Sequence, residues 1–423
     1  MSEKKVKKHD SRRVPSDGHG HDGLTVTNTP LTAVPVSEAA HAMFSSDGSE
    51  QLTDNTARQH SALGPNHVHL TNQVLGARSD ANERNILAVE VANLRLEMAQ
   101  PDVDSKMMAV LLARALFCHT LGHDVSSFAA IKAVMLTQDA KTEFERHVAY
   151  LCVSMFLHPG HELSLLMVNT FQKALGERTT SQLEVSAALN TLSSIASPDM
   201  VPALLPFVLH CARGEESPTI RMRAIFTLKR FVQLVPSCLD THQKTLKRAL
   251  ADSDVGVMSA ALALYSELID RDPKPYLPLL SAFVHIFGQL VAGKIPNLDF
   301  QGVPAPWVQT RALHIITALA VADPQLAQTS ALPLLRTAFV LAVTLLDRNP
   351  YHAVLCESLR GLRQIAPHLD AECAKELAAE LQPHVEKLLA YRNENRRAMG
   401  VEAKGLLIAL NPEQEQHVDQ IAG

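Results

Sequence analysis

Three groups of closely spaced histidines are the residues most able to bind a metal ion. His119 and His123 lie four apart in ALFCHTLGHDV (115–125), beside Cys118 and Asp124. That spacing places two side chains on one helical face, and imidazole, thiolate and carboxylate groups all bind zinc. Because His123 follows Gly122, where this helix should stop, the two rings need not converge. We therefore expect histidines that meet the negative end of a helix dipole rather than a metal site.

The other two histidine groups are weaker candidates. His158 and His161 flank a Pro-Gly turn in FLHPGHEL, and the sequence lacks the histidine that a zincin needs four residues after the first. The segment GHGHDG (18–23) places two histidines in a polar stretch without further ligands. The chain also has no P-loop, nucleophile-elbow or kinase-type signature. We expect no catalytic residue, no metal, no cofactor and no enzymatic activity.

The composition indicates the elements that must position any site. Hydrophobic residues make up 46% of the chain and aromatic residues only 4%, whereas Leu, Ala, Val and Met are abundant. This composition favours helices packed on helices over sheets. We expect an all-α fold.

Hydrophobic periodicity supports helices from about Leu70 to the C-terminus. Apolar residues recur at helical spacing, as in Ile86-Val89-Leu94-Leu96, Met108-Leu111-Leu112-Ala115-Leu116 and Val185-Ala188-Leu189-Leu192-Ile195. Polar breaks such as Ser217-Pro218-Thr219 and Asp252-Ser253-Asp254 separate them. Paired helices in units of roughly 40 residues are typical of HEAT or armadillo repeats, whose stacking gives a solenoid, an α-α superhelix.

The ends and one insertion depart from this pattern. Residues 1–65 are rich in Ser, Asp, Gly, His, Thr and Pro, which predicts a disordered N-terminal tail before a repeat domain over 66–423. The start, MSEKKVKKHDSRR, lacks the apolar segment of a signal peptide. The insertion GKIPNLDFQGVPAPW (293–307) ends in the only tryptophan, and we expect Trp307 to fill the core after a helix that begins at a proline.

Charge and cysteine usage limit the partners. The net charge is -5 and the pI is near 6.5, so nothing favours nucleic acid as a partner. Six cysteines in apolar segments without CxxC spacing are typical of buried, reduced thiols in a cytosolic chain.

One local cluster of basic residues could form a ladder for acidic ligands on successive repeats, or simply a solvated face: Arg221, Arg223, Lys229, Arg230, Lys244, Lys247 and Arg248.

Several longer strings resemble a known family. YLCVSMFLHPGHELSLLMVNT (150–170), AALNTLSSIASPDMVPALLPFV (187–208) and GKIPNLDFQGVPAPW (293–307) are similar to the trunk of large adaptins, the helical scaffold subunits of vesicle-coat adaptor complexes. The strings DVGVM (254–258) and VPAPW (303–307) resemble the epsilon type, found in the fourth adaptor-protein complex. The resemblance covers about Leu70 to Gly423 and corresponds to the front part of the family's trunk, so the trunk is expected to be incomplete at its C-terminus.

The resemblance implies a non-catalytic scaffold in a cytoplasmic heterotetramer with a small, a medium and a second large subunit. It also implies recruitment by a GTP-bound Arf-family GTPase to trans-Golgi or endosomal membranes, where such complexes associate peripherally and sort cargo. In this subunit type, the first repeats hold the small subunit and offer a GTPase-binding surface. The matching positions here are Phe128, Ile131 and Leu166, all apolar.

Two other classes of function stay open. A generic HEAT-repeat scaffold, such as a transport receptor or phosphatase scaffold, would bind acidic peptides through the ladder from Arg221 to Arg248. A helical metalloenzyme would use His119 and His123 and would hold stoichiometric metal.

Overall fold

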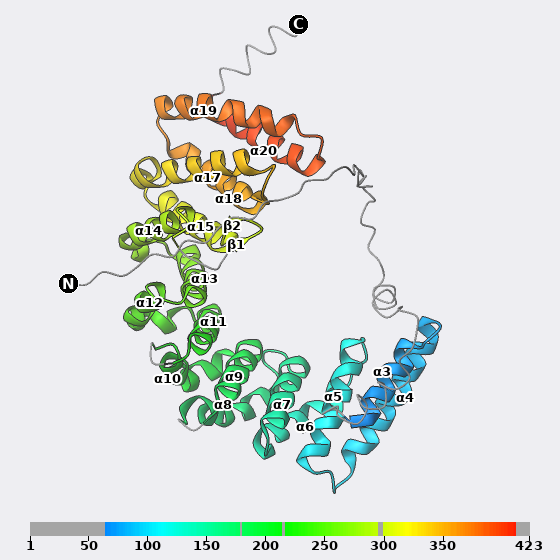
Figure 1. The fold of residues 1–423 in the computed structure, drawn as a ribbon. Coiled ribbons are helices and arrows are strands. Elements are labelled where there is room, and N and C mark those ends of the chain that lie inside the picture. Colours follow the sequence, from blue (N-terminus) through cyan, green and yellow to red (C-terminus); the bar gives the residue numbers. More distant parts are fainter. Residues whose placement is uncertain (1–63, 178–179, 214–215, 295–298, 412–423) are drawn as a thin grey trace, which may run out of the picture.

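The computed structural model describes residues 64–177, 180–213, 216–294 and 299–411, which form two layers of helices along a curved arc (Figure 1). The part of the expected tail before Gly64 lies outside these residues. One layer, here called the inner layer, lines the concave side of the arc. Its helices are α3 (Gly64–Leu75), α5 (Ser105–Thr120), α7 (Glu143–Phe156), α9 (Gln182–Ile195), α11 (Pro218–Leu234), α13 (Val255–Arg271), α15 (Pro306–Ala322), α18 (His352–Ile365) and α20 (Glu394–Leu410).

The outer layer covers the convex side (Figure 1). Its helices are α4 (Asp80–Ala99), α6 (Ser126–Asp139), α8 (Met167–Gly176), α10 (Val201–Cys211), α12 (Gln243–Leu250), α14 (Leu280–Val291), α17 (Leu332–Leu345) and α19 (Ala371–Leu389). Short helical connectors are η1 (Glu162–Leu166), η2 (Pro198–Met200), η3 (Pro236–His242), η4 (Lys274–Leu279), α16 (Pro324–Leu326), the π-helical η5 (Ala327–Ala331) and η6 (Ala366–His368). The predicted HEAT- and armadillo-like solenoid is confirmed.

The polar breaks of the sequence are helix starts. Ser217 accepts a hydrogen bond from the Ile220 N–H at 3.5 Å, and Pro218 occupies the first position of α11. Asp254 caps α13 in the same way through the Val257 N–H at 3.0 Å. Such caps satisfy amide groups that have no partner within the helix, so each break restarts a helix in a defined direction.

A single apolar core runs along the arc between the two layers, from Leu70 to Leu410. Buried hydroxyls also tie α9 to α7 and α11 to α9. The Thr191 hydroxyl donates to the Tyr150 carbonyl at 3.0 Å, and the Thr227 hydroxyl donates to the Leu189 carbonyl at 3.2 Å. Each repeat therefore buries its inward face only against its neighbours, as in other solenoids.

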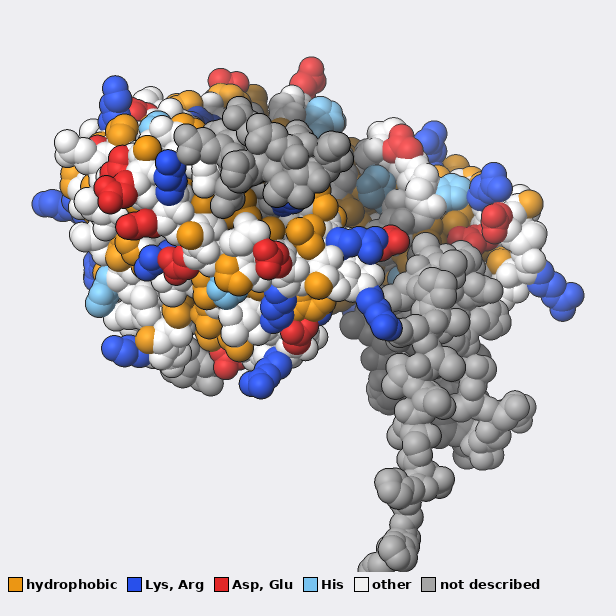
Figure 2. All heavy atoms as spheres, turned by 90° about the horizontal axis from the view of Figure 1, so that it is seen from above, with side chains coloured by type: hydrophobic (Ala, Val, Ile, Leu, Met, Phe, Trp, Pro, Cys, Tyr) orange, Lys and Arg blue, Asp and Glu red, His pale blue; other side chains and the backbone are white. Residues whose placement is uncertain are grey.

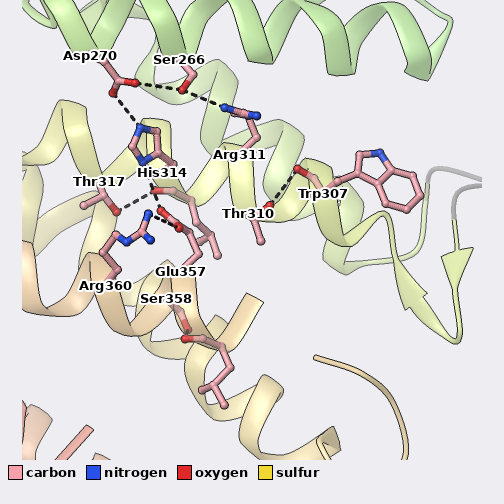
Figure 3. A network of polar contacts seen from close by, with 12 residues as sticks. Ser266, Asp270, Trp307, Thr310, Arg311, His314, Thr317, Glu357, Ser358 and Arg360 are labelled. Atoms are coloured by element: carbon pink, nitrogen blue, oxygen red, sulfur yellow. Dashed lines mark hydrogen bonds and ion pairs between the residues drawn. The ribbon is translucent and has the colours of Figure 1, made fainter. Parts of the chain in front are cut away.

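The insertion after α14 differs from the expectation. It contains a short hairpin in which β1 (Asp299–Phe300) pairs antiparallel with β2 (Val303–Pro304). Helix α15 does begin at Pro306, but Trp307 is 48% exposed, so the prediction that it fills the core was wrong. Figure 3 shows its indole pointing away from the body of α15. The first turn of α15 faces solvent on this side, whereas Val308 of the same turn is buried.

Among the residues that the structure describes, one stretch of helix, Pro324–Leu345, is long and apolar enough to cross a membrane by length and composition alone. The core helices of soluble proteins pass the same test, and this stretch consists of α16, η5 and α17. Because α17 packs against α18 and α19 within the solenoid, we assign this stretch to the core.

Candidate functional site

Exposed apolar side chains are concentrated in the repeats near the N-terminal end of the arc. Among the described residues, nine of the eighteen exposed large hydrophobic side chains lie between Leu121 and Leu183. Scattered exposed apolar residues are ordinary, but a concentration of this kind marks a surface that binds another protein. These repeats therefore contain the candidate site.

On the convex side, α6 and η1 carry what we call the outer apolar face: Phe128, Ile131, Met135, Leu165 and Leu166. Three of its residues, at positions 128, 131 and 135, are spaced along one side of α6, and η1 contacts α6. Ile131 is 38% exposed and Leu166 is 51% exposed. The structure thus brings the three positions implied by the resemblance to adjoining elements of two consecutive repeats.

Phe128 differs from its neighbours because it is half-buried. The guanidinium of Arg95, from α4, lies 5.0 Å from the centre of its ring, at cation-π distance. Asp124 lies nearby at the start of α6, and its hydrogen bonds from Ser126 hold the pKa of its carboxyl below the usual range, with a smaller contribution from the charge of Arg95. Arginine covers the Phe128 ring, so Ile131 and Leu166 are the more accessible of the three.

On the concave side, α7 carries what we call the inner apolar face: Phe144, Leu151 and Met155, which are 36%, 43% and 45% exposed. The opposite side of the same helix buries Tyr150 and Val153 in the core. An inner-layer helix that is apolar on both sides needs a partner on the concave side to cover its exposed residues. The sequence predictions did not include this face. The available signal was that α7 has more apolar residues than one buried stripe requires.

The seven basic residues of the predicted ladder do not form one surface. Arg221 is buried, with its guanidinium held by Asp252 at 2.7 Å, so it is not free to bind a ligand. Arg223, Lys229 and Arg230 are partly buried on α11, in the inner layer. The remaining three are exposed on α12, in the outer layer: Lys244, Lys247 and Arg248.

Charges of both signs are mixed on the face of the molecule drawn in Figure 2, without a large area of one sign. A polar pocket of about 510 Å³ opens between α6, α7, α8 and α9, and its lining also mixes signs. Within it, Arg146 pairs with Glu184 at 3.1 Å. On this face and in this pocket, electrostatic attraction of a partner would therefore depend on local groups rather than on a broad field.

Two of the three histidine groups serve as parts of turns and helix ends, and the third, GHGHDG (18–23), lies outside the described residues. His119 lies in the last turn of α5, with its ring against Phe156 at 5.3 Å. The His161 ring accepts a hydrogen bond from the Leu163 N–H at 3.1 Å and caps η1, so the turn expected here is confirmed. Across the described part of the chain, no three His, Cys, Asp or Glu side chains are grouped to hold a metal ion.

The cysteines are mostly unreactive by position. Cys118, Cys152 and Cys211 are buried as expected, and burial raises the pKa of each thiol to about 12. Such thiols stay protonated at neutral pH and are poor nucleophiles. Cys238 and Cys373 are only partly buried and Cys356 is exposed, contrary to the expectation that all six would be buried.

Comparison with known proteins decides the family. The family model of the adaptin N-terminal region matches residues 83–417, which is most of the described solenoid. The chain belongs to the adaptin family. This match begins in α4 and extends past α20, so both apolar faces lie within the adaptin region.

Similar curated proteins include epsilon adaptins, as the resemblance implied. The AP-4 complex subunit epsilon of Arabidopsis thaliana is 31% identical over 352 residues, which cover 83% of this chain and 36% of that protein. The AP-4 complex subunit epsilon-1 of Homo sapiens is 31% identical over 344 residues, which cover 81% of this chain and 29% of that protein. This adaptin chain therefore spans about a third of the length of the curated relatives it matches.

Among solved structures, a model of the full-length AP-3 complex in an intermediate open conformation aligns with a TM-score of 0.47 at 18% identity, covering 71% of this chain and 54% of that chain. The karyopherin Kap121p bound to Ste12p aligns with a TM-score of 0.49 at 12% identity, covering 84% of this chain and 38% of that chain. Both alignments have TM-scores below 0.5 and carry no argument about this chain.

Proposed function

We propose that this chain is the front part of the trunk of a large adaptor subunit of the epsilon type and acts as a non-catalytic scaffold of a vesicle coat. The observation that carries the proposal is the adaptin match over 83–417. Its relatives are named as subunits of adaptor complexes, which supports a role in assembly rather than in catalysis. The chain would comprise a disordered N-terminal tail, expected over 1–65, and a trunk, expected over 66–423, although α3 already begins at Gly64.

The inner apolar face is the proposed seat of the small subunit. A solenoid curves around what it binds, and Phe144, Leu151 and Met155 lie on its concave side. Burying three large apolar side chains of this kind supplies the sort of central anchor on which stable interfaces depend. The medium subunit and the second large subunit would complete the complex.

The outer apolar face is the proposed docking surface of an Arf-family GTPase. Ile131 and Leu166 are exposed on the convex side, away from the proposed small-subunit seat, so both partners can bind at once. Through this contact the complex would be recruited from the cytoplasm to trans-Golgi or endosomal membranes and would sort cargo there.

The generic peptide-binding scaffold is the alternative, and the burial of Arg221 removes one member of its ladder. Co-expression of the full chain with a small adaptor subunit, followed by size-exclusion chromatography with light scattering, separates the two. Co-elution at equal stoichiometry supports the adaptor scaffold. A folded chain that elutes alone would contradict it.

A further inference from the structure

His314 bridges three consecutive helices of the inner layer. It lies on α15, its Nε2 is 2.8 Å from Oδ1 of Asp270 on α13, and its Nδ1 is 3.4 Å from Oε1 of Glu357 on α18. Figure 3 shows the imidazole between the two carboxylates, one from the repeat on each side. Both ring nitrogens therefore face an acceptor, although the carboxylates lie on different helices.

The surrounding groups hold both carboxylates in place. The second oxygen of Glu357 lies 3.1 Å from the Arg360 guanidinium. The second oxygen of Asp270 accepts from the Ser266 hydroxyl at 3.4 Å, and Ser266 accepts from Arg311 at 3.5 Å. These contacts orient both carboxylates toward the imidazole and favour their ionised forms.

The bridge is complete only when the imidazole is charged. An imidazolium has two N–H donors, one for each carboxylate, whereas a neutral imidazole has one donor and one acceptor. After loss of the proton, one carboxylate faces the lone pair of a ring nitrogen, which is repulsive. That carboxylate must then turn away or bind water, and one of the two links between helices is lost.

The pKa of His314 agrees with this geometry. Its hydrogen bond with Glu357 contributes most and raises the pKa above 6.5, burial opposes this, and the hydrogen bond with Asp270 and the two carboxylate charges add to the rise. Other elements packed on α15 carry Lys274 in η4 and His285 in α14, and neither contributes to the shift. The remaining two elements packed on α15, which are α16 and η5, have no charged residue.

We propose that His314 is a pH-responsive clasp that joins α13, α15 and α18 when it is protonated and releases one of its two links when it loses the proton. In a solenoid each repeat contacts only its neighbours, so a link across three helices restrains the local curvature of the arc. The clasp would stiffen the C-terminal half at low pH and loosen it as the pH rises. This inference does not depend on the proposed adaptor function.

The pH window follows from the direction of the shift. A histidine with a raised native pKa contributes stability that is fully present below its unfolded pKa of about 6.5. That contribution is lost as the pH rises through the native pKa of His314. Loosening is therefore expected at a pH above about 6.5.

Hydrogen–deuterium exchange of the full chain at about pH 6 and about pH 8.5, corrected for the intrinsic pH dependence of exchange, tests the clasp. Peptides from α15 and α18 of the wild type should exchange several-fold faster at the higher pH. The His314→Gln variant should show no such change, because glutamine does not titrate. The matched control, His285→Gln, lies on the outer layer of the preceding repeat and should behave as the wild type.

A second measurement keeps the proposal testable if His314→Gln fails to fold. Nuclear magnetic resonance titration of the histidine ring protons should show a lower His314 midpoint in Glu357→Gln than in the wild type, since the variant keeps a hydrogen-bond acceptor and loses the charge. A wild-type midpoint at or below about 6.5 would overturn the proposal. Unchanged exchange between the two pH values in the wild type would overturn it as well.

Discussion

Arg221 of α11 and Asp252, just before α13, form a buried bidentate ion pair. Nε lies 2.9 Å from Oδ2 and Nη2 lies 2.7 Å from Oδ1, and only 9% and 10% of the two side chains are exposed. The third guanidinium nitrogen donates to the Glu216 carbonyl at 2.5 Å. One arginine thus fixes the start of α11 to the loop of the next repeat.

Replacing Arg221 with alanine should destabilise the fold, because it leaves the Asp252 carboxylate buried without its partner. We expect a loss of roughly 3–5 kcal/mol in the free energy of unfolding, measured by urea denaturation. Lys247→Ala, an exposed position on α12, is the control and should change that value by no more than about 0.5 kcal/mol. Equal effects of the two substitutions would mean that the ion pair is not structural.

The same pair should make stability sensitive to acid. Burial alone would raise the pKa of Asp252, but hydrogen bonds from Arg221 and the Asp254 N–H, with the charges of Arg221 and Arg248, outweigh it and hold the pKa below its usual range. The stability is present above the unfolded pKa of about 3.9 and is lost as the pH falls through the native pKa. Urea denaturation between about pH 5 and about pH 3 should show a smaller loss in Asp252→Asn than in the wild type. An equal loss in both proteins would contradict this assignment.

Gly361 marks the closest approach among α15, α17 and α18. A methyl group there would lie 2.5 Å from a Leu335 methyl and 2.6 Å from the Thr317 hydroxyl. Gly361→Ala should therefore cost about 1–3 kcal/mol of stability despite the better helix propensity of alanine. A methyl group added at Gly288 in α14 would have no neighbouring heavy atom within 4 Å, so Gly288→Ala should stabilise the fold by about 0.5–1 kcal/mol. Thermal denaturation of the two variants should therefore shift in opposite directions.

The outer apolar face should be required for GTPase binding but not for folding. Ile131→Asp and Leu166→Asp change exposed positions, so each should fold normally while weakening the binding of an Arf-family protein loaded with a non-hydrolysable GTP analogue. A loss of roughly 2 kcal/mol, about thirtyfold in Kd, is expected by surface plasmon resonance. Phe226→Asp, 44% exposed on α11, is the matched control and should bind as the wild type. Full binding by both outer-face variants would remove this face from the proposal.

Much of the fold could be predicted from the sequence, because each repeat signals itself locally. The stripe from Val185 to Ile195 is helical, and its last four members are buried, as the periodicity indicated. Periodicity was only partly right in α4, where Leu94 is buried but Val89 and Leu96 are 55% and 66% exposed. That helix also packs through Leu87 and Met98, which the expected stripe did not include. Several apolar stripes were available, and only the neighbouring helices decide which one turns inward.

The candidate site was less predictable because it depends on partners distant in sequence. Family resemblance led to Ile131 and Leu166, but no local pattern distinguishes Leu151, which faces the concave side, from the buried Tyr150 beside it. The basic ladder failed as a single surface for a related reason. Spacing cannot show that Arg221 is held by Asp252 across a repeat boundary.

The most direct test of the adaptor proposal is co-expression of the full chain with a small adaptor subunit, comparing the wild type with a Leu151→Asp, Met155→Asp double variant. Phe226→Asp, on the same concave side, is the control. The proposal predicts that the wild type and the control co-elute with the small subunit at equal stoichiometry, whereas the folded double variant elutes alone. A wild-type chain that folds but never retains the small subunit would contradict the proposal.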